Sequence, residues 1–94
     1  MSDVPIERHT FAVLVANEPG VLARVIGLFS GRGYNIESLS VAEVDRERGQ
    51  SRITLVTSGT RMVIEQIKAQ LERLVPIQWV RDLTEEGPFV GREL

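Results

Sequence analysis

The stretch from Asn17 to Asn35, NEPGVLARVIGLFSGRGYN, restricts the fold of this chain more than any other. Its opening turn contains Pro19 and Gly20, and proline suits the first turn of a helix because its φ is already helical and it lacks an N–H. An amphipathic segment follows, and Gly33 marks its far end in the manner of a C-cap. The apolar run from Thr10 to Val15 precedes the turn and is typical of a buried strand. The sequence therefore predicts a strand that turns tightly into a helix.

The predicted helix carries an apolar face. Residues at the spacing i, i+3, i+4 and i+7 lie on one side of a helix. In this segment those positions are occupied by Leu22, Val25, Ile26 and Phe29. Apolar side chains on such a face belong to the core far more often than to a ligand site. We therefore expect these four side chains to be buried.

The rest of the chain alternates between strand patterns and helix patterns. Runs rich in β-branched residues predict strands, a polar run with Gly49 predicts a hairpin loop, and an amphipathic run from Thr60 predicts a second helix that stops before Pro76. The predicted elements are strands at 9–16, 36–45, 51–57 and 77–83, helices within 17–35 and at 60–74, and a hairpin loop at 46–50. This β-α-β-β-α-β order is that of an α+β, ferredoxin-like fold, in which two helices cover one face of a four-stranded antiparallel sheet.

Strict alternation assigns the side chains of two of these strands to faces. In the strand at 36–45 one face receives Ile36, Ser38, Ser40, Ala42 and Val44, and the other receives Glu37, Leu39, Val41 and Glu43. In the strand at 77–83 one face receives Ile77, Trp79, Arg81 and Leu83, and the other receives Gln78, Val80 and Asp82. The first of these strands has at least one polar face, which is expected at a sheet edge.

Composition limits the kind of protein that this chain can be. It has 94 residues, a net charge of −2 and no cysteine, so we expect one small domain with a modest core and neither disulfides nor thiolate metal sites. No basic stripe is visible, so neither nucleic acid nor a membrane is an expected partner. No run is apolar over the length of a membrane span or resembles a signal peptide, so we expect a soluble, cytoplasmic protein. Residues 1–8 are expected to form an arm, 9–84 the domain and 85–94 a linker.

Candidate catalytic groups are few. His9 is the single histidine, and at the start of a strand we expect a surface or strand-end imidazole rather than a catalytic base. The serines have no local partner that would activate a nucleophile. Glu37 and Glu43 are expected to be solvated carboxylates, because a site for a hard cation needs several converging oxygens. The sequence therefore points away from an enzyme and implies no metal and no cofactor.

The turn before the first helix indicates a binding site for a free amino acid. The first N–H groups of a helix have no intrahelical acceptor and, with the helix dipole, attract an anion. Because Gly20 has no Cβ, a carboxylate can approach the N–H groups of Val21 and Leu22 closely. Asn17 before the turn and Asn35 after the helix each offer a carbonyl to an ammonium group and an N–H₂ to a carboxylate. The competing interpretation is a simple turn that both asparagines cap.

These residues also resemble a known family. The run NEPGVLARVIGLFSGRGYNIESLSV is similar, almost position for position, to the N-terminal ACT domain of the small, regulatory subunit of acetohydroxyacid (acetolactate) synthase. The segments SRITLVTSG, VIEQIKAQLERLVPI and VRDLT are also similar, so the resemblance covers about His9 to Thr84. ACT domains in general share only the turn and its glycine, whereas RVIGLFS-x-RGYNIESL is characteristic of this subunit.

The resemblance implies a regulatory, non-catalytic protein. Such subunits bind the large, thiamine-diphosphate-dependent catalytic subunit, raise its activity, and make it sensitive to feedback by valine in branched-chain amino-acid biosynthesis. The effector contacts of the family correspond here to Asn17, Gly20, Val21, Leu22, Asn35 and Ile36. In this family the effector lies between two ACT domains, so Asn17 of one copy is expected to face Asn35 of the other in a homodimer or higher homo-oligomer.

Other functions share parts of this pattern. A free-standing ACT sensor of another small amino acid fits the same residues. An RNA-binding module has the same topology but needs aromatic side chains on its central strands, and residues 51–57 have none. A small acyl-phosphate hydrolase also has this topology, but its Gly-rich anion cradle and arginine are missing, since the turn is NEPG and Arg24 lies within the helix. Family members usually continue into a second domain, and this chain reaches only GPFVGREL, where that domain would begin.

Overall fold

The computed structural model describes residues 4–16, 20–74 and 77–84 of the chain. Its elements are β1 (Glu7–Ala16), α1 (Val21–Arg32), β2 (Asn35–Asp45), β3 (Gln50–Gly59), α2 (Arg61–Arg73) and β4 (Ile77–Asp82). The predicted order of strands and helices is therefore confirmed. The first three strands extend one or two residues beyond their predicted bounds at one or both ends.

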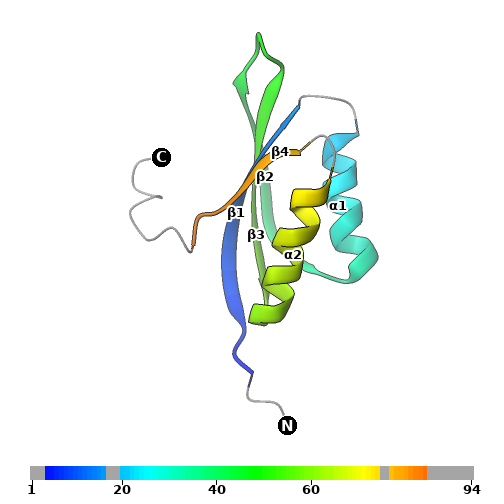
Figure 1. Cartoon of the computed structure of the whole chain (residues 1–94), viewed down its shortest axis with the longest axis vertical. Coiled ribbons are helices and arrows are strands. Elements are labelled where there is room, and N and C mark those ends of the chain that lie inside the picture. The colour runs from blue at the N-terminus through cyan, green and yellow to red at the C-terminus, as the bar shows by residue number, and fades with distance from the viewer. Residues whose placement is uncertain (1–3, 17–19, 75–76, 85–94) are drawn as a thin grey trace.

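The strands form one antiparallel sheet in the order β2-β3-β1-β4. Strands β1 and β3 are central, while β2 and β4 are the edges. Both helices pack on the same face of this sheet, and the β2–β3 hairpin extends past the ends of the other strands (Figure 1). The predicted ferredoxin-like arrangement is confirmed.

The core lies between the sheet and the helices. Alternate side chains of β1 and β3 point into it, which is the two-residue period of a strand with one face covered. Helix α2 begins at its N-cap Thr60, whose Oγ1 accepts a hydrogen bond of 3.3 Å from the N–H of Val63. The buried apolar residues of the core are Phe11, Val13, Val15, Val21, Val25, Phe29, Ile53, Leu55, Ile64, Ile67 and Leu71.

The apolar face of α1 differs from the prediction. The buried side chains are Val21, Val25 and Phe29, at i, i+4 and i+8, whereas Leu22 is 38% exposed and Ile26 is 41% exposed. The expectation that Leu22 and Ile26 are buried was wrong. Helix α1 is apolar over two adjacent stripes, and either stripe fits a helical period. Packing against the sheet selects the stripe that starts at Val21 and leaves the other at the surface.

Strand β2 departs from strict alternation because its pairing with β3 is irregular. The register shifts between Ile36 and Ser38, so Ile36 pairs with Thr57 and Leu39 pairs with Leu55. An extra residue of this kind moves every later side chain to the opposite face. Ile36 and Leu39 therefore both pack against the core, and the prediction that they lie on opposite faces was wrong.

Strand β4 carries a similar irregularity. Its register with β1 shifts between Leu14, which pairs with Trp79, and Val15, which pairs with Ile77. Ile77 consequently packs against the core together with Val80, while Trp79 remains 39% exposed. The prediction that Ile77 and Trp79 share a face was wrong for the same physical reason as in β2.

Candidate functional site

The start of α1 has the backbone geometry of an anion site. Gly20 is the N-cap and adopts a left-handed conformation, with φ 89° and ψ −10°. Its carbonyl accepts the N–H of Arg24 at 2.9 Å, which is the first hydrogen bond of the helix. The N–H groups of the residues before Arg24 have no hydrogen-bond acceptor within the helix, so they point out of its N-terminal end. The first turn contains no acidic side chain that would repel an anion.

The space beside Gly20 is open. Among the described residues, a Cβ placed on Gly20 would meet no heavy atom within 4 Å. The positive φ adds a second reason for glycine at this position, since an L side chain is strained there whatever the space. Asn17, the other predicted contact on this side of α1, lies outside the described residues.

The two residues after Gly20 face in different directions. The side chain of Val21 is 6% exposed and belongs to the core, so only its backbone N–H is available to a ligand. Leu22 is half-exposed, and so is Ile26 one turn further along α1. The first two turns of α1 therefore carry exposed apolar side chains, which a small amino acid with an aliphatic side chain could use.

Asn35 and Ile36 begin β2 at the far end of α1. The side chain of Asn35 is exposed, and its Nδ2 donates to Ser58 Oγ at 2.8 Å. Its carbonyl accepts a hydrogen bond from the hydroxyl of Thr57. Ile36 is half-buried and packs against the core. Both residues are thus held in place by β3 while the amide of Asn35 remains at the surface.

The predicted contacts that the structure describes do not meet in a single pocket of one chain. Gly20 precedes α1 and Asn35 follows it, and a helix of 12 residues is about 18 Å long. The predicted site consists of two halves at opposite ends of α1. A ligand can touch both halves only if they come from different copies of the chain.

A buried polar network is the feature that the sequence did not predict. His9 is 4% exposed, although a surface or strand-end imidazole was expected. Its Nδ1 lies 2.7 Å from Oδ2 of Asp82, which is 5% exposed, and its Nε2 lies 2.8 Å from Oε1 of Glu7. Arg61 approaches the other carboxylate oxygen of Glu7 at 3.2 Å. Glu7 stands two residues before His9 on the same face of β1, which is a local signal, whereas Asp82 is remote in sequence.

This network shifts the pKa of His9 and of Glu7. Burial of the imidazole opposes its charged form, but the hydrogen bonds and charges of Glu7 and Asp82 outweigh that effect and raise the pKa of His9. The hydrogen bond from His9 and the charge of Arg61 lower the pKa of Glu7, against an opposing effect of burial. The described part of the chain holds no group of three or more His, Cys, Asp or Glu side chains suited to a metal ion.

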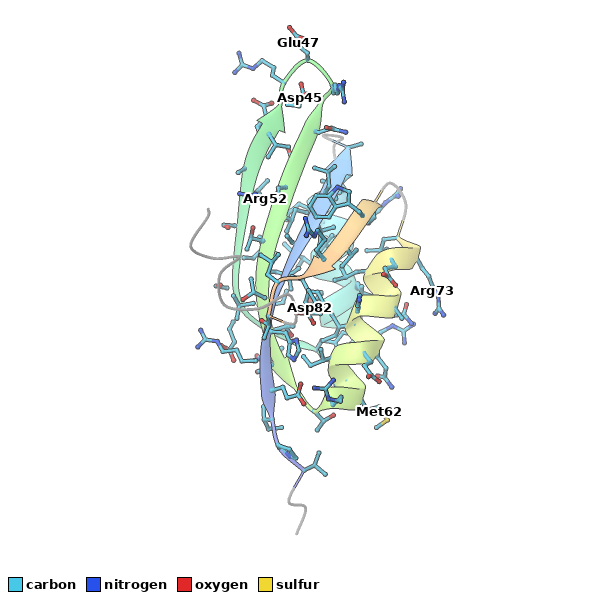
Figure 2. The ribbon with its side chains drawn as sticks, turned by 60° about the vertical axis from the view of Figure 1, so that its left-hand side comes forward. Asp45, Glu47, Arg52, Met62, Arg73 and Asp82 are labelled. Atoms are coloured by element: carbon cyan, nitrogen blue, oxygen red, sulfur yellow. The ribbon has the colours of Figure 1, made fainter. Side chains whose placement is uncertain are left out.

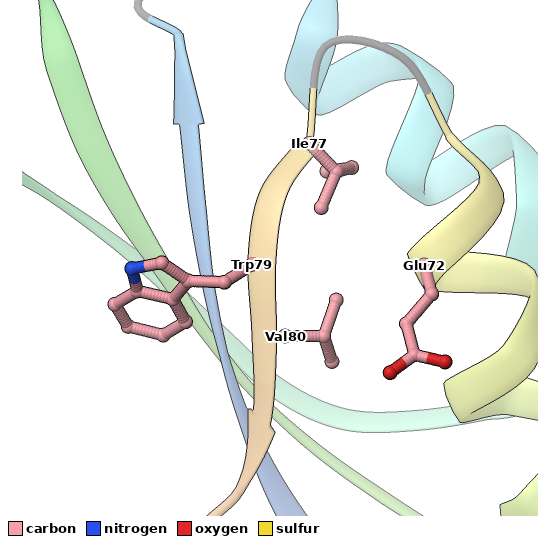
Figure 3. A pocket seen from close by; sticks show the side chains of 4 residues that line it. All are labelled: Glu72, Ile77, Trp79 and Val80. Atoms are coloured by element: carbon pink, nitrogen blue, oxygen red, sulfur yellow. The ribbon is translucent and has the colours of Figure 1, made fainter.

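A shallow groove lies beside the edge strand β4. Glu72, Ile77, Trp79 and Val80 line it, with a volume of about 350 Å³. Figure 3 shows that Ile77, Val80 and Glu72 face one another while Trp79 turns to the other side of β4. The guanidinium of Arg81 lies 5.9 Å from the centre of the Trp79 ring, a distance typical of a cation–π contact. Within the described residues, none of the predicted site residues lines this groove.

The fold defines the structural class of this domain. The described part of the structure superposes on the ACT domain of a GTP pyrophosphokinase from Chlorobium tepidum with a TM-score of 0.69 over 83% of this chain and 99% of that one. The sequence identity is 13%, so this likeness concerns the fold alone. Within the described residues no helix has the length and apolar character to cross a membrane. The chain has the fold of an ACT domain.

The sequence then specifies the family. The family described as "AHAS small subunit-like ACT domain" matches residues 11–78, and the chain belongs to it. The chain is 51% identical, over 93% of its length, to a probable acetolactate synthase small subunit of Archaeoglobus fulgidus. It also resembles the crystal structure of an acetolactate synthase small subunit from Thermotoga maritima, with a TM-score of 0.73 and 38% identity over 81% of this chain. The match covers 53% of the first protein and 47% of the second, so the chain spans about half the length of these relatives.

Proposed function

We propose that this chain is the effector-binding, regulatory part of an acetolactate synthase, that it binds valine between two of its copies, and that it thereby modulates the catalytic subunit. The observation that carries the proposal is the N-terminus of α1 in a member of this family. Gly20 leaves the surface beside the first helical N–H groups open, and an exposed apolar side chain, Leu22, stands next to them. This combination matches a ligand with a carboxylate at one end and an aliphatic group nearby.

The carboxylate of valine would dock on the N–H groups of Val21 and Leu22. Hydrogen bonds to a charged partner contribute roughly 1.5–3 kcal/mol each, and the helix dipole adds to them. The ammonium group would then be held by carbonyl oxygens of Asn17 and of the partner copy's Asn35. The valine side chain would lie against Leu22 and Ile26, where each buried methylene contributes about 0.8 kcal/mol.

The position of Asn35 supports a site shared by two copies. It begins β2, an edge strand of the sheet, and its amide is anchored on Ser58 rather than turned into its own core. An antiparallel association of two β2 edges about a twofold axis would carry Asn35 of each copy toward the helix start of the other. The exposed pair of Leu22 and Ile26 would be covered in the same assembly.

The regulatory step follows from linkage between the two sites. Valine that bridges two copies stabilises one arrangement of the dimer, and the catalytic subunit would bind that arrangement differently. Coupling between distinct sites is typically worth about 1–3 kcal/mol. In this scheme the chain supplies no catalytic group, and the thiamine-diphosphate chemistry belongs entirely to its cytoplasmic partner.

The test begins with valine binding to the chain alone, by calorimetry and by sizing with and without valine. We expect saturable binding that increases the dimer fraction. Asn35→Ala should weaken binding at least tenfold, while Met62→Ala, an exposed change on α2 away from the β2 edge, should leave it unaltered. Ser58→Ala controls for the loss of the hydrogen bond that orients Asn35. Equal affinity in the Asn35→Ala and Met62→Ala proteins would refute the shared site.

A second measurement separates regulation from binding. The chain is titrated into a purified acetolactate synthase catalytic subunit, and activity is followed with and without valine. We expect a change in activity that saturates with the chain and depends on valine. If valine binds but activity is unchanged, the chain is a sensor without this partner, and a thermal-shift screen of the twenty amino acids identifies its preferred ligand.

A further inference from the structure

We propose that Glu7, His9 and Asp82 form a protonation-controlled clasp that fastens β1 to the end of β4 and to the first turn of α2. The clasp is closed when the imidazole carries a proton on both ring nitrogens, and its Glu7 side opens when one proton leaves. It lies at the start of β1, away from Gly20 at the start of α1.

The geometry of the ring requires two protons. Carboxylate oxygens lie 2.7 Å from Nδ1 and 2.8 Å from Nε2 of His9, and ionised carboxylates only accept hydrogen bonds. A neutral imidazole has a single N–H, so its second nitrogen would set a lone pair against a carboxylate. The imidazolium has two N–H groups and satisfies both partners. A ring buried to this extent does not exchange these partners for water.

The charges around the ring balance in the closed state. The described residues bring Glu7 from β1, Asp82 from β4 and Arg61 from α2 to this region. From β3 the residue paired with His9 is the uncharged Thr57, and the ring of Phe11 stacks on the imidazole at 6.3 Å. Two carboxylates thus face two cations, provided that His9 is protonated.

The two sides of the clasp differ in how firmly they are held. Asp82 is buried, and its Oδ1 also accepts the N–H of Thr84 at 3.1 Å. The side chain of Glu7 is 25% exposed and has Arg61 as a second partner at the surface. After loss of one proton, the remaining N–H stays on the more deeply buried carboxylate of Asp82. Glu7 then faces a lone pair and moves with Arg61 toward solvent.

The clasp sits where β4 leaves the sheet. Thr10 donates its N–H to Thr84 Oγ1 at 2.9 Å and accepts the N–H of Leu83 at 2.8 Å, so the backbone beyond Asp82 is tied to β1 beside the ring. Figure 2 shows Asp82 well below the hairpin tip that carries Glu47. Protonation of the His9 imidazole therefore governs how tightly β1 is held to the start of α2. This contact lies next to Asp82, where β4 ends.

The direction of the pH effect follows from both shifts. The pKa of His9 is raised, so its contribution to stability is complete below about pH 6.5 and is lost as pH rises through the higher folded value. The pKa of Glu7 is lowered, so its contribution is complete above about pH 4.5 and is lost as pH falls through the lower folded value. The clasp is strongest between about pH 4.5 and 6.5 and weakens as pH rises above this window and the imidazole loses its proton.

The test uses the fact that His9 is the single histidine, so its NMR signals need no assignment among others. At pH 6 the nitrogen shifts of both Nδ1 and Nε2 should report bound protons, and the titration midpoint should lie above 6.5. Glu7→Gln should lower the midpoint by about one pH unit, because a neighbouring charge is removed. Arg61→Gln should raise the midpoint, since it removes a competing cation.

A matched control removes the same charge elsewhere. Glu47→Gln changes the hairpin tip by one charge and should leave the midpoint in place within ~0.2 units, because an exposed charge at that distance is screened. A midpoint at or below 6.5 in the unmodified protein, or equal midpoints in the Glu7→Gln and Glu47→Gln proteins, would overturn the proposal. The nitrogen shifts of the unmodified protein decide the matter even if a variant fails to fold.

Discussion

Replacement of Gly20 by aspartate tests the proposed effector site most directly. The residue has φ 89°, and a Cβ placed on it meets no heavy atom of the described residues within 4 Å, so the expected cost to the fold is backbone strain. A left-handed conformation costs an L residue about 1–2 kcal/mol, with asparagine and aspartate among the best tolerated. For a domain of this size each kcal/mol lowers Tm by about 4–8 °C. The Gly20→Asp protein is therefore expected to fold, with Tm lowered by roughly 4–8 °C.

The effect on binding should be far larger than the effect on folding. The new carboxylate would stand where the carboxylate of valine docks, beside the N–H groups of Val21 and Leu22. Loss of two charge-assisted hydrogen bonds removes about 3 kcal/mol or more, which is at least ~100-fold in Kd. Gly20→Asn has the same shape and backbone tolerance without the charge, so it isolates the electrostatic part of the loss.

The assay is calorimetric titration of valine into the unmodified chain and both variants at equal salt. We expect the Gly20→Asn protein to bind valine more tightly than the Gly20→Asp protein by at least tenfold, at similar Tm. If both variants bind equally, the carboxylate of the ligand does not lie at the start of α1. If both bind as well as the unmodified chain, the site itself is elsewhere.

Three further predictions concern stability and are read from urea unfolding. Thr60→Ala removes the N-cap bond of α2 and should cost about 1 kcal/mol, whereas Thr60→Ser should retain most of it. Phe29→Ala should cost about 3–5 kcal/mol because the side chain is 1% exposed, while Leu22→Ala should cost under about 1 kcal/mol; similar losses would contradict the observed face of α1. Gly33→Ala places a side chain at φ 71° and should cost about 1 kcal/mol, less for Gly33→Asn.

The order of elements could be predicted from the sequence because each element carries a strong local signal. The turn at Gly20, the C-cap at Gly33 and the N-cap at Thr60 are residues whose own chemistry begins or ends a helix. The apolar face of α1 could not be decided in the same way. Its two stripes differ by about one residue of rotation, and only contact with the sheet distinguishes them.

The errors in β2 and β4 have a common origin. Alternation predicts faces only while the pairing is regular, and one register shift exchanges the faces beyond it. Neither Ile36–Ser38 nor Ile77–Trp79 contains a glycine or proline that would announce such a shift. These irregularities arise from the fit of each edge strand to its neighbour, which is a property of the assembled sheet.

The candidate site likewise has a part that the local sequence predicts and a part that depends on residues remote in sequence. The start of α1 could be predicted because its turn and helix are contiguous in sequence. The sequence alone could not show whether position 20 needs glycine for its left-handed backbone or for the space that a missing Cβ leaves. The network at His9 could not be predicted, because Asp82 reaches it from the opposite end of the domain. Whether Asn35 completes a ligand site in a partner copy stays a prediction.

The strand order also bears on how the chain folds. The two central strands, β1 and β3, are not neighbours in sequence, and even their closest pair, Ala16 with Gln50, encloses the whole of α1 and β2. The centre of the sheet can therefore assemble only after a large loop has closed. The β2–β3 hairpin can form earlier, because its strands are joined by a short turn and their contacts are local. Refolding should accordingly be limited by the docking of β1, at a rate typical of mixed α/β domains rather than of helical bundles.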